Sequence, residues 1–234
     1  MSVPDAEDLL WSFQIDGERR IWDWDDGAPH PWVLQPVREP KAGSYSGHVP
    51  VDAWSLTTGG RVRVESGLEF GLFRELDRDR TVTWIVAQPL ALTVPGPSAK
   101  PRDLIPDFLT LHADGSLKVW NVRPTERMGA KFRAASALIG EACSHRGIGY
   151  EVFSGFGVTR RVNLGWIDAY RDPPAGLERF RPQIETFVGD GCRFGDLLTF
   201  AGHYGIPSVW HMVWGGALHI DLDARIVESS VVTR

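Results

Sequence analysis

Cysteines and long apolar runs are scarce in this 234-residue sequence. Its two cysteines, Cys143 and Cys192, lie far apart and form neither a C-x-x-C nor a paired-histidine spacing, so they indicate no disulfide framework and no zinc site. We expect both to be reduced, mostly buried thiols. No apolar run reaches the ~18 residues of a membrane-spanning helix, and the N-terminal segment MSVPDAEDLL lacks the layout of a signal peptide. The sequence therefore predicts a cytoplasmic protein with no membrane partner.

A positive net charge is also missing. The formal charge is −5, whereas tight binding of duplex DNA by a lone protein usually accompanies a basic balance. The acidic excess is local, because residues 1–26 hold eight acidic side chains and two arginines, which leaves the remaining chain at +1. Within residues 118–133, Glu126 alone opposes five cations, namely Lys118, Arg123, Arg127, Lys131 and Arg133. This run predicts either contacts to DNA phosphates, for which Lys118, Arg127, Lys131 and Arg133 are the candidates, or a solvated helix face.

The chain is long enough for one large domain or two small ones, and its 43% hydrophobic content predicts a real core. Residues 1–60 are acidic and rich in Trp, Pro and Gly, which predicts an irregular lead-in. Residues 61–172 read as strands and helices of an α/β core. The composition changes after the loop YRDPPAG, so we place a boundary near residue 172, followed by a smaller domain over residues 173–234.

Four elements of the core can be predicted from periodicity. Residues 65–77 place Leu68, Leu72 and Leu76 on one helical stripe. Residues 81–92 alternate as a strand with Pro89 near an edge or bend. A helix is expected over residues 129–147, ended by Gly147, and a short strand over residues 150–153. With the hairpin described next, this order predicts an α/β core sheet with flanking helices.

The segment Ile105–Pro124, IPDFLTLHADGSLKVWNVRP, predicts a β-hairpin whose register can be derived. A two-residue Asp-Gly turn would place Asp107 opposite Val122. A three-residue loop, Ala113-Asp114-Gly115 with Gly115 in the left-handed conformation, instead places Asp107 opposite Asn121. Because side chains alternate along a strand, Asn121 and Arg123 then share a face with Asp107. An ordinary hairpin with a polar face would use the same turn.

The tail predicts three helices and a strand. Helices are expected over residues 177–188, 194–204 and 207–214, with a turn at Gly205 and Pro207 in the first turn of the last helix, and ALHIDL as the strand. This order resembles a small winged helix. The helix over residues 207–214 carries no Lys or Arg, so we expect it to contact protein or support the core and not to read DNA sequence. His203, His211 and His219 are interpreted as core or surface histidines, and Trp84, Trp120, Trp166, Trp210 and Trp214 as core packing.

The acidic residues near the hairpin suit a divalent metal site. Phosphodiester hydrolysis by a metal nuclease needs carboxylates to hold one or two cations that activate water and neutralise phosphate charge. Magnesium keeps several waters, so two or three protein ligands suffice. Asp107 and a glutamate of the helix over residues 65–77 could supply them, since Glu65 and Glu69 lie one turn apart. Each of these acids alone is more simply a surface carboxylate.

Four short motifs follow one another in an order that resembles a known family. They are Ser66-Gly67-Leu68-Glu69, Ala87-Gln88-Pro89-Leu90, Pro106-Asp107-Phe108-Leu109 and Asn121-Val122-Arg123-Pro124. In this order they resemble the motifs of TnsA-like transposase endonuclease subunits of the PD-(D/E)xK class. The similarity extends through TTGGRVRVESGLE, VNLGWIDAY and HMVWGGALHIDL, and covers most of residues 44–234.

The resemblance implies a fold and an activity. The implied fold is a restriction-endonuclease-like mixed sheet core flanked by helices, followed by a small winged-helix-like C-terminal domain. The implied activity is magnesium-dependent cleavage of the 5′ strand at transposon DNA ends, with manganese as a substitute metal. The implied partners are a DDE-type transposase subunit and an ATP-dependent regulator.

The resemblance also assigns the site residues. Glu69, Asp107 and Asn121 occupy the metal-binding positions, and Arg123 stands where the family has a lysine; Gln88 and Glu65 are supporting residues. Asn121 is neutral where the family has Glu or Gln, which predicts weaker metal affinity. Arg123 is permanently charged, so it can clamp a phosphate but makes a poor base.

These departures leave alternatives open. One is a catalytically inactive nuclease-fold adaptor that assembles or targets a transposase complex. Another is a winged-helix transcription regulator, which the acidic balance and the apolar second helix of the tail disfavour. Lys118 cannot replace the lysine because alternation puts it on the face opposite Asn121, whereas Lys131 could approach from the following helix.

Overall fold

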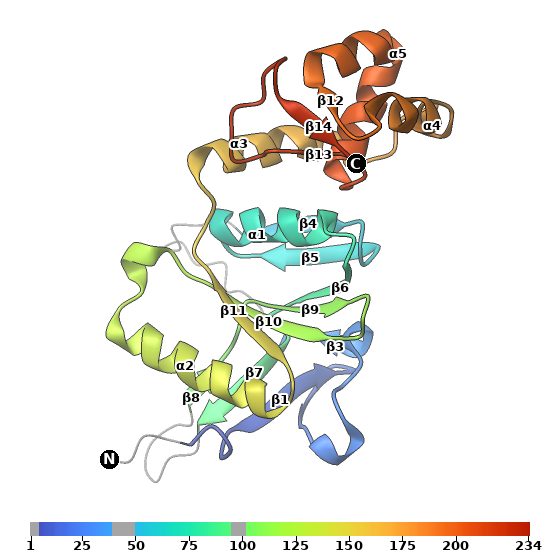
Figure 1. The fold of residues 1–234 in the computed structure, drawn as a ribbon. Coiled ribbons are helices and arrows are strands. Elements are labelled where there is room, and N and C mark those ends of the chain that lie inside the picture. Colours follow the sequence, from blue (N-terminus) through green and yellow to red (C-terminus); the bar gives the residue numbers. More distant parts are fainter. Residues whose placement is uncertain (1–4, 39–49, 95–101) are drawn as a thin grey trace. The chain divides into compact units, whose positions relative to one another are not determined.

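The computed structural model describes residues 5–38, 50–94 and 102–234, which divide into two compact units (Figure 1). Unit 1 comprises the residues up to Asp77 together with Thr81–Gly155, and unit 2 comprises Arg78–Arg80 together with Phe156–Arg234. The boundary between the two units thus follows Gly155 and does not coincide with the composition change near residue 172. The reason is helix α3, Val158–Ile167, whose Leu164 and Ile167 are buried in the core of the tail.

Unit 1 contains a four-stranded mixed sheet with the order β11-β10-β9-β6. Its strands are β6 (Val82–Ala87), β9 (Phe108–His112), β10 (Leu117–Val122) and β11 (Gly149–Phe153). β6, β9 and β10 pair antiparallel, whereas β10 and β11 pair parallel and are joined by α2 (Ala130–His145). Parallel neighbours need such a crossover. The mixed α/β core expected from the order of strand, hairpin, helix and strand is confirmed at this level.

The hairpin of β9 and β10 has the derived register. Trp120 pairs with Phe108 and Lys118 with Thr110, so the next position brings Asp107 opposite Asn121. The His112 N–H donates to the Ser116 carbonyl at 2.9 Å, which leaves a three-residue loop, and Gly115 has φ 84°. The three-residue loop with a left-handed glycine is therefore confirmed.

The predicted strand over residues 81–92 is two strands in two sheets. After β6 the chain bends at Gln88, whose φ is 47°, and at Pro89, and continues as β7 (Leu90–Val94). The bend at Pro89 was predicted, but the single strand was wrong. β7 joins a second sheet, whose other strands are described next.

The prediction of an irregular lead-in is wrong for residues 10–35. They form β1 (Leu10–Ile15), β2 (Glu18–Ile21), the short 3-10 helices η1 (Trp24–Asp26) and η2 (Pro31–Val33), and β3 (Leu34–Gln35). Trp11, Phe13 and Ile15 alternate along β1 and are buried. β1 pairs with β7, which pairs with β8 (Arg102–Leu104), so the sheet has the order β2-β1-β7-β8, and β3 also pairs with β1. This alternation of apolar side chains was a strand signal within a Pro- and Gly-rich stretch.

A hairpin precedes helix α1 (Gly67–Arg78), which was predicted over residues 65–77. Its strands are β4 (Val51–Ser55) and β5 (Gly60–Val64). Buried Asp77 near the end of α1 accepts hydrogen bonds from the Ser55 hydroxyl at 2.6 Å and the Thr57 N–H at 3.0 Å. These contacts tie the hairpin turn to the helix whose first turn carries Glu69.

Unit 2 packs three helices on a small antiparallel sheet. The helices are α3, α4 (Leu177–Val188) and α5 (Phe194–Trp214), with the 3-10 helix η4 (Asp168–Tyr170) after α3. The strands are β12 (Cys192–Arg193), β13 (His219–Ile220) and β14 (Val231–Thr233), in the order β12-β14-β13. The buried side chains of all three helices and of β14 form one core cluster.

The break between the last two predicted helices lies at Gly202 and not at Gly205. Gly202 has φ 59° and ψ 179°, a conformation that residues with a side chain rarely adopt, and it kinks α5. Gly205 lies inside α5, where an added Cβ would come within 3.1 Å of the Ala201 Cβ and 3.3 Å of the Phe180 ring. Gly205 therefore serves close packing, and Pro207 lies inside the helix and not in its first turn.

The cysteines and most tryptophans behave as predicted. Cys143 is buried, Cys192 is partly buried, and both are free thiols. Trp120, Trp210 and Trp214 are buried, and Trp84 packs against the core of unit 1. Trp166 is the exception, because it is 59% exposed. It follows Val158 and Val162 at intervals of four residues, so it belongs to the outer face of α3.

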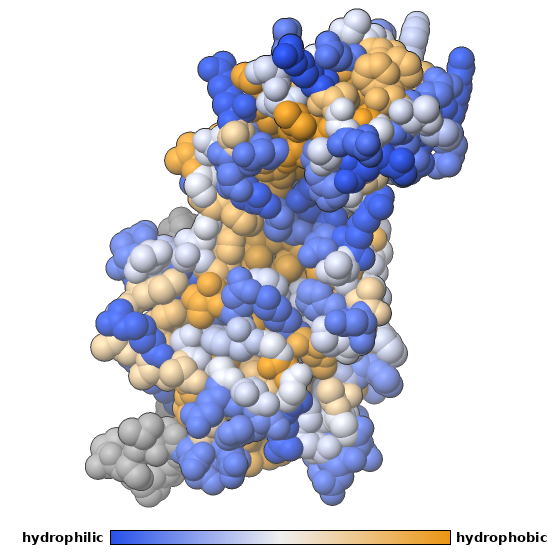
Figure 2. Space-filling view, viewed as in Figure 1, coloured by the Kyte–Doolittle hydropathy of each residue, from blue (hydrophilic) through white to orange (hydrophobic). Residues whose placement is uncertain are grey.

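The surface view shows polar and apolar side chains interspersed on the visible face of each unit (Figure 2). Within the described residues, no helix has the length and hydropathy needed to cross a bilayer.

Candidate active site

Glu69 is held at the start of α1 by local hydrogen bonds. Its backbone N–H donates to the Ser66 hydroxyl at 3.2 Å, and its carboxylate accepts from that hydroxyl and from the Glu65 N–H, both at 2.8 Å. This reciprocal arrangement is close to a capping box, which the sequence S-x-x-E favours. Glu69 is therefore fixed in place by the helix terminus itself. Its pKa is raised by burial, against the lowering effect of these hydrogen bonds.

Asp107 lies immediately before β9 and is brought close to the glutamates of the α1 start. Its Oδ2 accepts a 2.6 Å hydrogen bond from the Val122 N–H on the neighbouring strand β10. The pKa of Asp107 is raised to about 7, chiefly by burial and also by the negative charges of Glu69 and Glu65, while the Val122 hydrogen bond and Arg38 act in the opposite direction. The structure thus gathers Glu65, Glu69 and Asp107, which we call the acidic cluster.

Gln88 and Arg38 fix the outermost member of the acidic cluster. Buried Gln88 donates its side-chain amide to Glu65 Oε1, and the Arg38 guanidinium donates to both Glu65 oxygens at 2.9 and 3.0 Å. Gln88 and Glu65, which were both predicted as supporting residues, are thus in direct contact. Arg38 was missed, because it lies 27 positions before its partner and no local pattern marks it.

Asn121 faces a hydroxyl network. It is 7% exposed, and its amide nitrogen donates to the Tyr150 hydroxyl at 2.8 Å, which is itself 2.7 Å from the Ser136 hydroxyl. Burial raises the pKa of Tyr150, and the charge of Asp107 contributes to this rise, which places Tyr150 near the acidic cluster. Among the described residues no hydrogen bond is donated to the side-chain oxygen of Asn121, Oδ1. This oxygen is the ligand atom that Asn121 can offer.

Glu69, Asp107 and Asn121 carry oxygen atoms of the kind that magnesium prefers as ligands. Carboxylate oxygens of Glu69 and Asp107 and the carbonyl oxygen of Asn121 are hard ligands, and magnesium retains several waters. Within residues 5–38, 50–94 and 102–234, no group of three or more His, Cys, Asp or Glu side chains is arranged to hold a metal ion. Part of the Glu69 and Asp107 lone pairs is also committed to N–H and O–H donors.

Arg123 does not pair with the acidic cluster. Its Nε donates to the Arg127 carbonyl at 3.1 Å, and its guanidinium lies 5.6 Å from the centroid of the Phe132 ring. No salt bridge joins it to Glu69 or Asp107 in the described part of the chain. The structure thus brings Glu69, Asp107 and Asn121 together but directs Arg123 elsewhere.

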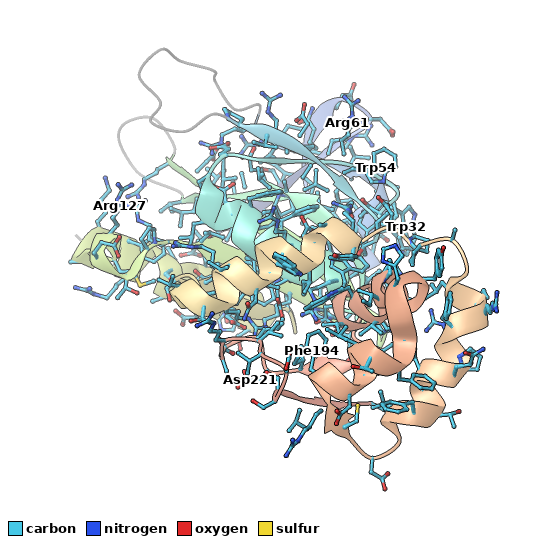
Figure 3. The ribbon with its side chains drawn as sticks, turned by 90° about the horizontal axis from the view of Figure 1, so that it is seen from above. Trp32, Trp54, Arg61, Arg127, Phe194 and Asp221 are labelled. Carbon is cyan, nitrogen blue, oxygen red and sulfur yellow. The ribbon has the colours of Figure 1, made fainter. Side chains whose placement is uncertain are left out.

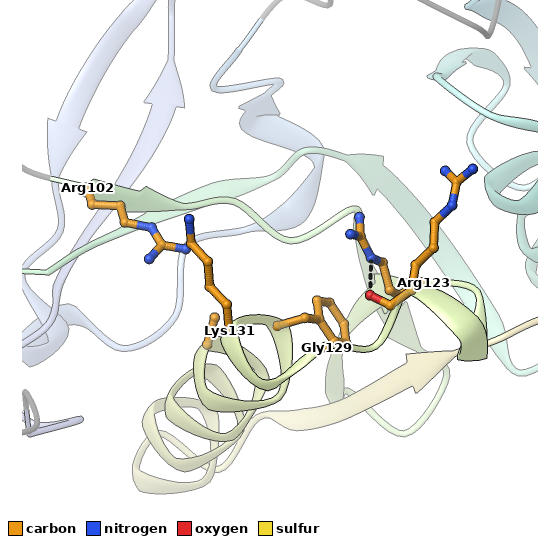
Figure 4. A pocket seen from close by; sticks show the side chains of 7 residues that line it. Arg102, Arg123, Gly129 and Lys131 are labelled. Atoms are coloured by element: carbon orange, nitrogen blue, oxygen red, sulfur yellow. Dashed lines mark hydrogen bonds between the residues drawn. The ribbon is translucent and has the colours of Figure 1, made fainter.

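Arg123 instead lines an open pocket of about 370 Å³ (Figure 4). We call it the basic pocket; its lining residues are Arg102, Arg123, Arg127, Gly129, Lys131, Phe132 and Ala135. They come from the start of β8, the end of β10, the 3-10 helix η3 (Thr125–Arg127) and the first turns of α2. Arg102 was missed, since it is 21 residues before Arg123 and outside the basic run.

Two of the predicted phosphate contacts lie outside the basic pocket. The Lys118 ammonium pairs with Glu151 and lies 4.1 Å from the Trp120 ring centroid. Arg133 donates to the Met128 carbonyl. Of the four candidates, Arg127 and Lys131 alone line the pocket.

Comparison with protein-family models finds no match, and comparison with curated proteins finds no match either.

Proposed function

We propose that the protein is a TnsA-like DNA endonuclease subunit of a heteromeric transposase, with a weakened magnesium-dependent site for cleaving the 5′ strand at transposon ends. The observation that carries the proposal is the meeting of Glu69, Asp107 and Asn121 from three separate elements. Burial raises the pKa of both Glu69 and Asp107, and the charge of Glu69 also raises the pKa of Asp107. Keeping two such carboxylates ionised is costly, and a bound cation offsets this cost. Carboxylates with raised pKa values gather preferentially at functional sites.

The topology of unit 1 supports the proposal. The order α1, β6, β9, β10, α2, β11 forms a mixed sheet with one parallel pair, as expected for a restriction-endonuclease-like core. The acids lie at the start of the helix and at the edge of the hairpin, as the resemblance implies. In unit 2, the three helices with a three-stranded antiparallel sheet support a winged-helix-like domain.

The residues have distinct roles in the proposed reaction. Glu69 and Asp107 hold the cation, and Asn121 adds a neutral oxygen whose orientation is fixed by Tyr150. When bound there, magnesium supplies an activated water and neutralises charge on the scissile phosphate. Gln88 and Arg38 hold Glu65 in place beside the ligands. The proposed partners are transposon-end DNA, a DDE-type transposase subunit and an ATP-dependent regulator, in the cytoplasm.

A second candidate function is favoured by Arg123. A working nuclease of this class needs a cation beside the attacking water, whereas Arg123 hydrogen-bonds Arg127 and lies over Phe132. This arrangement suits an inactive nuclease-fold adaptor that binds DNA and assembles or targets a transposase complex.

Calorimetric titration with manganese separates the two candidates. The proteins are the wild type, Asp107→Ala and the double variant Asn121→Glu/Arg123→Lys. Saturable binding to the wild type that is lost in Asp107→Ala supports the endonuclease, and a nicking assay with transposon-end DNA and the partner subunits then tests cleavage. Binding to the double variant alone would reject the endonuclease in favour of the adaptor.

A further inference from the structure

The basic pocket concentrates positive charge without a compensating acid. Arg102, Arg123, Arg127 and Lys131 line it, and no acidic residue does. Within the described part of the chain, none of these four side chains forms a salt bridge. Figure 4 shows the Arg102 and Lys131 side chains directed toward one another. Cations that converge in this way repel each other, so the arrangement favours an anion in the pocket.

The shape and the donors of the pocket specify the anion further. Guanidinium groups present several N–H donors in a planar fork that matches the oxygens of a phosphate. Gly129, Phe132 and Ala135 provide an apolar wall that a sugar or base could contact. The first-turn N–H groups of α2, which has no side-chain cap, add to the favourable field but do not define the site.

We propose that the basic pocket binds a phosphate group of a DNA strand, and that Arg123 belongs to this pocket and not to the acidic cluster. The inference rests on the proposed function only in taking DNA as the source of the phosphate. Arg102 is a new member of the site, contributed by β8. Lys118 is excluded because Glu151 neutralises it. The phosphate is either an internal diester of a continuous strand or the terminal monoester of a cut one.

DNA binding without metal tests the pocket separately from catalysis. The anisotropy of a labelled duplex is measured in EDTA over 50 to 200 mM salt, for the wild type and for Arg102→Gln/Lys131→Gln. Each lost phosphate lowers the slope of log affinity against log salt by about 0.9, so the double variant, which disables a pocket for one phosphate, should lose about 0.9. Arg61→Gln is the matched control, because Arg61 is an exposed cation on β5 that Figure 3 shows apart from Arg127.

The source of the phosphate is decided with 5′-phosphorylated and 5′-hydroxyl duplexes of one sequence. A preference for the phosphorylated duplex that disappears in the double variant assigns the terminal monoester. Equal binding of both duplexes, with the slope reduced in the double variant, assigns the internal diester. Both results support the pocket.

The outcomes also separate this inference from the proposed endonuclease. An unchanged salt slope in Arg102→Gln/Lys131→Gln, or no DNA binding by the wild type, overturns the pocket whatever the cleavage assay shows. A reduced slope together with no metal-dependent nicking by the wild type keeps the pocket and rejects the endonuclease. Arg123→Lys keeps the charge but loses the fork, so its affinity should fall by about threefold to tenfold while the slope changes little.

Discussion

The Val122 backbone N–H donates a 2.6 Å hydrogen bond to Asp107 Oδ2 across the hairpin. The same hairpin places Asn121 opposite Asp107 and leads directly into Arg123. The end of β10 thus carries Asn121, and its Val122 N–H orients the Asp107 carboxylate. The residue that follows β10, Arg123, lines the basic pocket. The acidic cluster and the basic pocket are therefore contacted by consecutive residues, Val122 and Arg123.

Replacing Asp107 by Asn should stabilise the fold at neutral and higher pH. The pKa of Asp107 is raised from its ordinary value of 3.8 to about 7, chiefly by burial. The ionisation penalty is absent below pH 3.8, grows as pH rises toward 7 and is complete above it. Asp107→Asn should accordingly gain about 2 to 4 kcal/mol in the free energy of unfolding at pH 8. Urea unfolding at pH 4.5 and pH 8 measures it. An equal gain at both values would contradict the assignment, and Asp172→Asn, at an exposed loop position outside the cluster, is the control.

Metal binding should depend steeply on pH. Because Asp107 is protonated below about pH 7, a cation must displace its proton. Manganese affinity is expected to fall by about tenfold from pH 7.5 to pH 6 and to vary little above pH 8. Calorimetry in buffers of different ionisation enthalpy would show release of about half a proton at pH 7 and about one at pH 6. Pronounced binding without proton release would place the metal away from Asp107.

Tyr150→Phe should weaken the Asn121 position without unfolding unit 1. The change removes the hydroxyl that joins Asn121 to Ser136, which costs about 1 kcal/mol in the free energy of unfolding. Manganese affinity should fall by about tenfold, since the freed amide can rotate away. Ser136→Ala, which keeps the Tyr150 contact to Asn121, is expected to lose stability but retain metal affinity. Equal metal affinity in Tyr150→Phe and the wild type would remove Tyr150 from the site.

Two glycines of helices should respond oppositely to alanine. Gly202 has φ 59°, so Gly202→Ala should destabilise unit 2 by about 1 to 3 kcal/mol. Gly71 in α1 has open space around an added Cβ and no left-handed φ, so Gly71→Ala should stabilise unit 1 by about 0.5 to 1 kcal/mol. Thermal unfolding of both variants measures the contrast. A stable Gly202→Ala would mean that the kink at Gly202 is not required.

The hairpin and the helix that carry the candidate site could be predicted from short-range sequence signals, for a physical reason. The turn chemistry of Asp114-Gly115 determines the hairpin register, and the S-x-x-E motif determines where the helix that carries Glu69 begins. β1 was missed because Pro and Gly nearby outweighed the alternation of Trp11, Phe13 and Ile15.

Long-range partners could not be predicted from one sequence. Arg38 reaches Glu65 and Arg102 reaches the basic pocket only through the packing of separate elements. The side-chain direction of Arg123 is a further case. Alternation places it on the face of Asp107, yet the carbonyl of Arg127 and the ring of Phe132 direct its guanidinium into the pocket.

Placing Glu at position 121 and Lys at position 123 should raise metal affinity and lower DNA affinity. In Asn121→Glu/Arg123→Lys, the new carboxylate adds a charged metal ligand, so manganese affinity should rise by about tenfold or more. The loss of the guanidinium fork should lower affinity for duplex DNA in EDTA, by about threefold to tenfold. Asn121→Glu alone is the control, because it changes the metal site and leaves Arg123 in the pocket. Calorimetry and anisotropy on the three proteins measure both affinities. A double variant that gains metal affinity and keeps full DNA affinity would show that Arg123 does not serve the pocket, and one that gains neither would show that position 121 does not face the cation.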